Sequence, residues 1–318
     1  MTATAPSPAP RPGEFISPAA LMAIRSLELR ARAVMEGFMT GLHRSPWHGF
    51  SAEFTEYRQY SPGDDPRHLD WKVFARSDRF FIRKFEDETN LRCHMAVDQS
   101  RSMDCGSLAW TKAHYAATLA ATLGLFLHRQ GDATGLLSFD ERIRDWIPAR
   151  HRPGHLRRIM LALEKPAGGA ATDLTAPLQR LAEIVRKRGL MVLISDFLAP
   201  VERLEHCFSQ LGACGHEITV FQVLDPAEAT FDFTKEILFE DAETGRTLFI
   251  DPAAARRSYL EKLGAHEQGL RAVCAKLGIG FQRVLTNEPL EIALSGFLRE
   301  RARRGRPVRR AAQHGTRT

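Results

Sequence analysis

Five oxygen-bearing side chains follow apolar segments in a pattern that could bind a metal ion. The sequence D-x-S-x-S, formed by Asp98, Ser100 and Ser102, comes directly after the short apolar run HMAV. Alternate residues of an extended segment point to the same side, so this spacing brings the carboxylate and both hydroxyls together. Two later segments add Thr172, in the loop GGAATDL, and Asp196, which follows the apolar run LMVLIS.

This donor set favours Mg²⁺, which takes oxygen ligands in an octahedron at about 2.0–2.1 Å and keeps several waters. We expect Ser100, Ser102 and Thr172 to bind the ion directly. Asp98 and Asp196 would reach it through water. Little negative charge would then touch the metal, and a carboxylate from another molecule could complete the octahedron. The pattern predicts a site that grips a partner's carboxylate rather than one that turns over a substrate, with Mn²⁺ or Ca²⁺ as alternative ions.

Alternating strands and helices are expected to position this site. Between 91 and 296, the apolar runs RCHMAVD, ATGLLSFD, LMVLISD and EITVFQVLD alternate with segments of helical periodicity. The run RDWIPA is the expected hairpin partner of the second strand. This alternation of strands and helices predicts an α/β fold with a doubly wound, mostly parallel sheet and helices on both faces. In such sheets, ligands bind at the carboxyl ends of the strands.

The rest of the chain divides into three predicted parts. Residues 1–17 form a polar, Pro/Ala-rich disordered lead, and residues 18–90 form a small module with a helix over 18–42 and two short strands. Residues 297–318 form a basic tail with eight arginines and one acidic residue, so the remainder of a chain of net charge +6 is close to neutral. The tail could contact nucleic acid, anionic lipid or an acidic protein, or could be solvated without a partner.

Composition indicates the cellular compartment of the protein and the redox state of its cysteines. No apolar run approaches the roughly 20 residues that a membrane-spanning helix needs, and the lead has no apolar stretch of signal-peptide type. We therefore expect a cytoplasmic protein. The five cysteines form no CxxC pair and no zinc-ligand spacing, which predicts reduced thiols.

Two motifs carry a family resemblance. The segments DQSRSM, GGAATDL and LISDF together resemble the metal-ion-dependent adhesion site of von Willebrand factor A domains. The stretch EFTEYRQYSPGDDPRHLDWKVFAR resembles the signature of a bacterial family, domain of unknown function family 58, whose members place it just before such a domain. The resemblance covers about 34–285. It implies a von Willebrand factor A-like fold, a Mg²⁺ adhesion site and partnership with a MoxR-type AAA+ ATPase in chaperone-like remodelling or maturation of a protein complex.

The signature stretch has two interpretations. Its charged residues could fix the N-terminal module to the main domain through a network of ion pairs, or they could form a docking surface for the ATPase. The candidate partner-binding residues are Arg58, Asp64, Asp65, Arg67, Asp70, Trp71 and Arg76.

Two other functions compete with the adaptor. The first is a Mg²⁺-dependent hydrolase or phosphatase with Asp98 as nucleophile. Gln99 and Ser100 disfavour it, because aspartyl phosphotransfer normally sets a second acid near the nucleophile. The second is a nucleic-acid-binding protein that acts through the arginine-rich tail. That tail lacks interleaved aromatic residues and a groove-reading element. We therefore predict a non-enzymatic adaptor with no catalytic residues.

Overall fold

The computed structural model describes residues 15–44, 56–59, 81–84, 91–168, 174–232, 237–240, 247–250 and 252–304. Several predictions lie outside these ranges and stay predictions. They concern the disordered lead over 1–14, the tail from 305 onward, Thr172, and all the signature-stretch candidates except Arg58. No helix in the described ranges is long and apolar enough to cross a membrane.

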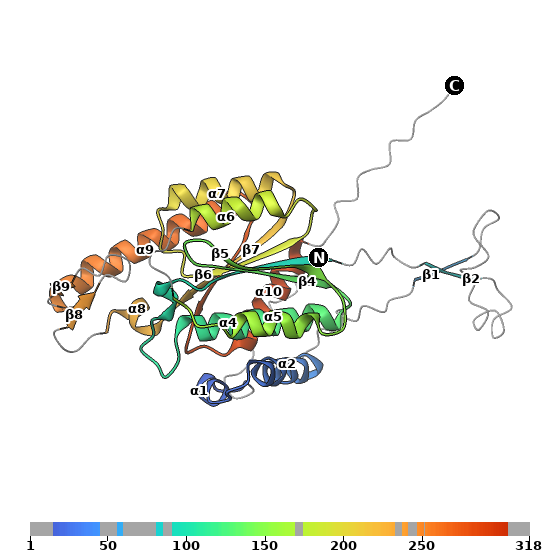
Figure 1. Cartoon of the computed structure of the whole chain (residues 1–318), viewed down its shortest axis with the longest axis horizontal. Helices are drawn as coiled ribbons and strands as arrows, with labels where there is room; N and C mark the ends of the chain where they lie inside the picture. Colours follow the sequence, from blue (N-terminus) through green and yellow to red (C-terminus); the bar gives the residue numbers. More distant parts are fainter. Residues whose placement is uncertain are drawn as a thin grey trace, which may run out of the picture.

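A six-stranded sheet forms the centre of the molecule (Figure 1). Its strand order is β10-β7-β6-β3-β4-β5, and every neighbouring pair is parallel except β4 and β5. The predicted hairpin partner is therefore confirmed as an antiparallel edge strand. The strands are β3 (Arg92–Asp98), β4 (Ala133–Phe139), β5 (Ile143–Arg150), β6 (Leu190–Ser195), β7 (Glu217–Leu224) and β10 (Gly280–Leu285).

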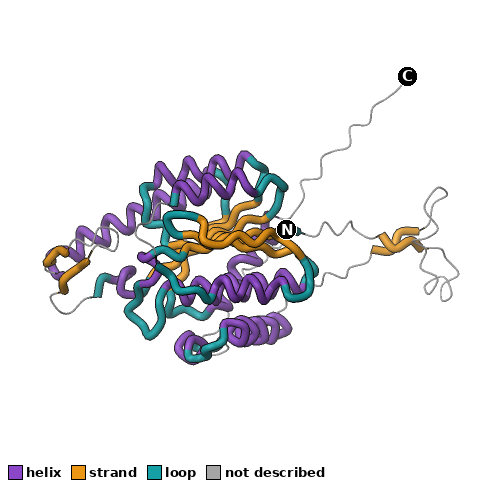
Figure 2. The backbone as a smooth tube through the Cα atoms, viewed as in Figure 1, coloured by secondary structure: helices purple, strands orange, loops and turns teal. Residues whose placement is uncertain are grey.

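Helices cover both faces of this sheet, as Figure 2 shows. One buried cluster lies between the sheet and helices α4, α5 and α10, and a second lies between the sheet and α6, α7 and α9. The central strand β6 is buried along its whole length, which explains why every residue before Ser195 is apolar. The helices are α4 (Lys112–Arg129), α5 (His155–Leu163), α6 (Thr175–Ile184), α7 (Val201–Ala213), α9 (Pro252–Lys276) and α10 (Leu290–Arg304). The predicted doubly wound α/β architecture is confirmed.

The N-terminal helix differs from its prediction in two respects. The expected single helix over 18–42 is two helices, α1 (Pro18–Met22) and α2 (Leu27–Arg44). The break is stabilised by Ser26, whose Oγ accepts a hydrogen bond from the Leu29 amide at 3.4 Å. Its packing also differs: Leu27 and Phe38 of α2 lie in the same core cluster as α4 and α10. The predicted division at 90 thus does not separate this helix from the main domain.

The C-terminal boundary also shifts. The basic tail was predicted to begin at 297, but Phe297 is 1% exposed and α10 continues to Arg304. Phe297 packs against Phe221 of β7, with ring centroids 6.3 Å apart. Because the Phe297 side chain belongs to the core, the first part of the arginine-rich segment is part of helix α10 and not of a tail.

Two pairs of short strands and a short helix lie outside the six-stranded sheet. The strands β1 (Glu56–Gln59) and β2 (Phe81–Lys84) pair antiparallel, and Arg58 lies opposite Ile82 in that register. The strands β8 (Ile237–Glu240) and β9 (Thr247–Ile250) also pair antiparallel. A short helix that was not predicted, α8 (Pro226–Thr230), follows β7 and is capped by Asp225.

Candidate metal centre

The candidate site lies at the point where the winding of the sheet reverses. From β3 the chain passes to β4 on one side, whereas β6 pairs with the other side of β3. Crevices at the carboxyl ends of strands that flank such a switch point are the usual ligand sites of doubly wound sheets. Asp98 ends β3, and Asp196 directly follows β6. The fold therefore brings together the ends of the two strands that carry the predicted carboxylates.

Asp98 is turned inward and held at both of its oxygens. Its Oδ1 accepts a hydrogen bond from the Ser100 amide at 2.9 Å, and its Oδ2 accepts one from the Ser195 hydroxyl at 2.6 Å. The residue is 0% exposed. This carboxylate therefore fixes the loop that follows β3, and its predicted contact with an ion through water stays a prediction.

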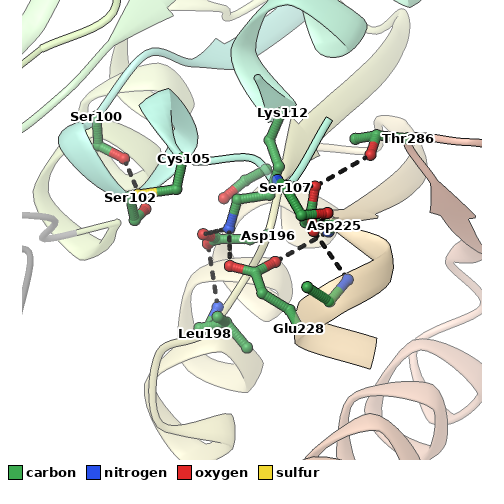
Figure 3. Close-up of polar contacts among 12 residues, drawn as sticks. Ser100, Ser102, Cys105, Ser107, Lys112, Asp196, Leu198, Asp225, Glu228 and Thr286 are labelled. Atoms are coloured by element: carbon green, nitrogen blue, oxygen red, sulfur yellow. Dashed lines mark hydrogen bonds and ion pairs between the residues drawn. The ribbon is translucent and has the colours of Figure 1, made fainter. Parts of the chain in front are cut away.

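The two serine hydroxyls are placed as a pair of metal ligands would be. The Oγ atoms of Ser100 and Ser102 lie 3.1 Å apart (Figure 3). Neighbouring corners of an octahedron with metal–oxygen distances of about 2.1 Å are separated by roughly 3.0 Å. Ser102 belongs to the short helix η2 (Arg101–Asp104) and remains partly exposed, while Ser100 is buried. The donor chemistry and the spacing fit Mg²⁺.

Within the described ranges, no group of three or more His, Cys, Asp or Glu could hold a metal. An ion at this edge would therefore depend on the hydroxyls.

The third predicted hydroxyl ligand, Thr172, lies outside the described residues. The loop that leads to it begins beside the site, because the Gly168 amide donates a hydrogen bond to the Gln99 carbonyl at 2.9 Å. This contact directs the loop after α5 toward the D-x-S-x-S segment. The assignment of Thr172 stays a prediction.

Asp196 is positioned by a strained turn. The next residue, Phe197, has φ +52°, in the left-handed region that residues other than glycine rarely adopt. The Phe197 amide donates to Ser195 Oγ at 3.1 Å, and its carbonyl accepts from His266 Nε2 at 2.8 Å. Its ring is buried against Phe208. Packing thus maintains the turn, which sets the direction of the Asp196 carboxylate.

A lysine that sequence reasoning missed contacts one of the two predicted carboxylates, Asp196. Lys112 Nζ lies 3.0 Å from Asp196 Oδ2 and 2.6 Å from Glu228 Oε1. Figure 3 shows this side chain reaching from α4 toward both carboxylates. One signal in the sequence could have revealed it. Lys112 is the first residue of a helix, where a cation opposes the helix dipole and is favoured only if a carboxylate compensates it.

Electrostatic interactions couple these groups. Burial, and then the neighbouring Asp196, raise the pKa of Asp98 to about 7. Burial alone would lower the pKa of Lys112, but the carboxylates of Asp196 and Glu228 raise it above its ordinary value. A site with buried carboxylates that repel each other gains from any added cation.

Asp225 joins the surrounding loops at the same edge. Its carboxylate accepts hydrogen bonds from the Ser107 amide at 2.9 Å and the Ser107 hydroxyl at 2.5 Å. It also caps α8 through the Ala227 amide at 2.8 Å. The Trp110 indole donates to the Thr286 carbonyl at 3.1 Å, which ties the loop before α4 to the end of β10. Loops from β3, β7 and β10 therefore support one another around the candidate site.

This sheet, with a D-x-S-x-S loop and a second buried carboxylate at its switch point, defines a von Willebrand factor A-like domain. The chain belongs to the family described as "Protein of unknown function DUF58", which matches residues 56–269. An uncharacterized protein of Mycobacterium tuberculosis is 32% identical over 260 residues, which cover 80% of this chain and 81% of that protein. An uncharacterized protein of Mycobacterium bovis matches with the same values of 32%, 80% and 81%. The predicted family is confirmed.

Solved structures of several other proteins align with part of this chain. An aerotolerance-related membrane protein from Bacteroides fragilis aligns with a TM-score of 0.46 and 14% identity, over 67% of this chain and 99% of that chain. BatB from Bacteroides thetaiotaomicron aligns with a TM-score of 0.40 and 16% identity, over the same shares of 67% and 99%. The VWA domain of SpRpn10 aligns with a TM-score of 0.37 and 13% identity, over 64% of this chain and 94% of that domain.

Proposed function

We propose that this protein is a non-enzymatic adaptor that binds a carboxylate of a partner protein through a divalent cation, with Mg²⁺ as the first candidate. The observation that carries the proposal is the pair of hydroxyls at Ser100 and Ser102, 3.1 Å apart, on a loop fixed by the buried carboxylate of Asp98. Ser100, Ser102 and Thr172 would bind the ion directly, and Asp98 and Asp196 would reach it through water. The ion would supply the positive charge that a partner's carboxylate recognises.

The accessibility of Asp98 favours binding over turnover. A nucleophilic aspartate must present a free oxygen to its substrate. Here both oxygens of Asp98 accept hydrogen bonds, and the residue is 0% exposed. Asp196, the other carboxylate of the pair, is engaged by Lys112 and by the Leu198 amide. The hydrolase alternative therefore has little support among the described residues of this edge.

The partner we propose is a MoxR-type AAA+ ATPase together with a client protein. This part rests on the family to which the chain belongs. Nucleotide-driven motion of the ATPase would remodel a client that the adaptor holds by an acidic side chain. The signature stretch, including Arg58, is the proposed docking surface for the ATPase.

The proposal is tested by co-purification from an extract of the native cell. Tagged wild type, Asp98→Ala and Ser100→Ala are compared in Mg²⁺ and in chelator. Ser258→Ala is the control, because it removes an exposed hydroxyl in the interior of α9, outside the loops of this edge. Recovered proteins are identified by mass spectrometry, and a recovered AAA+ ATPase is purified and rebound to each variant.

The expected result is recovery of an acidic client by wild type and Ser258→Ala in Mg²⁺, with at least about tenfold less for the two site variants or in chelator. Equal recovery of the client by every variant, with or without metal, would disprove the adhesion mechanism. Failure to recover an AAA+ ATPase under any condition would remove that partner from the proposal.

A further inference from the structure

Lys112 is a buried cation whose placement needs an explanation. The residue is 1% exposed, although lysine is seldom fully buried unless it is paired. It stands at the first position of α4, where its charge opposes the helix dipole. Both costs are offset by two carboxylates, Asp196 Oδ2 at 3.0 Å and Glu228 Oε1 at 2.6 Å. The ammonium therefore links three elements: α4, the end of β6 and α8.

One of its two partners is a residue that the proposed metal site also needs. Asp196 is 1% exposed, and its Oδ1 accepts from the Leu198 amide at 3.4 Å while its Oδ2 faces Lys112. An ion and an ammonium at this carboxylate would repel each other, because both carry positive charge in a poorly solvated place. The two cations therefore compete for the same carboxylate.

The other partner of Lys112, Glu228, can still pair with the ammonium when an ion occupies Asp196. The Glu228 side chain is 26% exposed and is anchored on α8, where its Oε2 accepts from the Asp225 amide at 3.0 Å. This capping contact does not involve Asp196. Glu228 thus offers a fixed carboxylate outside the site, and Lys112 keeps a charged partner in either state.

We propose that Lys112 is an internal cation that competes with the divalent ion for Asp196 and is held by Glu228 when the ion binds. This inference rests on the proposed function, since it concerns the same metal site. The ammonium balances the charge of Asp196 in the metal-free protein. Its charge also lowers the affinity of the protein for the ion below the value that the oxygen ligands alone would give. Tight binding of the ion therefore depends more strongly on the partner's carboxylate.

The test is a titration of the full chain with Mn²⁺. Calorimetry and the electron paramagnetic resonance signal of the free ion measure the binding. Lys112→Met removes the charge and keeps an unbranched side chain, so we expect Mn²⁺ to bind at least about tenfold more tightly than to wild type. Lys112→Arg keeps the charge and should leave the affinity within about threefold of wild type.

Glu228→Gln tests the same mechanism in the opposite direction, without removing the buried charge. It keeps an oxygen to accept from the Asp225 amide, but of the two carboxylates that pair with Lys112 it leaves only Asp196. Mn²⁺ should then bind about threefold to tenfold more weakly. Asp104→Asn is the matched control, because it neutralises an exposed carboxylate of η2 in the same region. It should weaken binding clearly less than Glu228→Gln.

Thermal unfolding supplies a second readout. In chelator, Lys112→Met should unfold at a lower temperature than wild type, because two carboxylates lose their counter-charge. Saturating Mn²⁺ should raise its unfolding temperature by more than it raises that of wild type. A variant that is destabilised but gains no Mn²⁺ affinity would show that Lys112 is only a structural tie and would overturn the proposal.

Ser100→Ala separates this inference from the proposed function. If wild type binds Mn²⁺ and Ser100→Ala does not, but Lys112→Met binds no more tightly than wild type, the metal site stands and the competition is refuted. If the gain of Lys112→Met survives a second Ser100→Ala substitution, the ion binds elsewhere and the competition is also refuted. If neither wild type nor Lys112→Met binds Mn²⁺, both proposals fail.

Discussion

The hydroxyl of Ser195 donates a hydrogen bond of 2.6 Å to Oδ2 of Asp98 and so joins the ends of two neighbouring parallel strands. The same hydroxyl oxygen accepts from the Phe197 amide at 3.1 Å. One buried side chain therefore fixes the carboxylate that follows β3 and the turn that follows β6. Both halves of the candidate metal centre depend on it.

Ser195→Ala should lower the free energy of unfolding by about 1–3 kcal/mol, since it leaves a buried carboxylate oxygen and a buried amide without a partner. Urea denaturation in chelator measures this loss. Ser258→Ala, an exposed site in the interior of α9, is the control and should change the stability by less than about 0.5 kcal/mol. Equal stabilities of the two variants would contradict the linking role of Ser195.

The metal-free protein should lose stability as the pH rises toward neutrality. Burial and the nearby Asp196 raise the pKa of Asp98 from 3.8 to about 7, so the folded state binds this proton more tightly than the unfolded state. The stability that Asp98 contributes is complete below its unfolded pKa and is lost as the pH rises through its folded pKa. Denaturation in chelator at pH 5 and pH 7.5 should show a loss of about 2 kcal/mol that Asp98→Asn does not show. Parallel pH profiles of the two proteins would contradict this assignment.

Divalent cations should stabilise the wild type through the hydroxyl pair. An ion at about one hundred times its dissociation constant adds about 2.7 kcal/mol to the free energy of unfolding. Thermal unfolding with Mg²⁺ or Mn²⁺ should therefore occur several degrees higher than in chelator. Ser100→Ala should abolish this shift, whereas Ser258→Ala, at an exposed position of α9, should keep it. A shift that persists in Ser100→Ala would place the ion elsewhere.

The N-terminal helix α2 should contribute to the stability of the main domain. Phe38 is 3% exposed and packs edge-on against Phe126 of α4, with ring centroids 6.3 Å apart. Phe38→Ala should cost about 3–5 kcal/mol, the usual range for a buried aromatic residue. Leu29→Ala on the same helix is the matched control, because Leu29 is 56% exposed and should cost less than about 1 kcal/mol. Chemical denaturation distinguishes the two, and similar losses would show that α2 is not part of the core.

Several features of the fold follow from local sequence. The buried strand over 190–195 is apolar up to Ser195, and Asp98 follows the apolar residues 95–97, so the sequence alone predicted both strand ends. The D-x-S-x-S spacing likewise predicted that two hydroxyls meet. These predictions succeeded because strand burial and side-chain alternation depend on neighbouring residues.

The tertiary structure decided which distant groups meet those strand ends. Lys112 and Glu228 lie far apart in the sequence, and only the fold brings the start of α4 and the helix α8 together beside Asp196, at the end of β6. The same holds for Ser195, which reads as one more residue of an apolar strand until its pairing with β3 places it against Asp98. Sequence determined the strands, the helices and the kind of ligands at the edge. Long-range packing determined the counter-charges, because Coulomb energy depends on distance in space and not on separation along the chain.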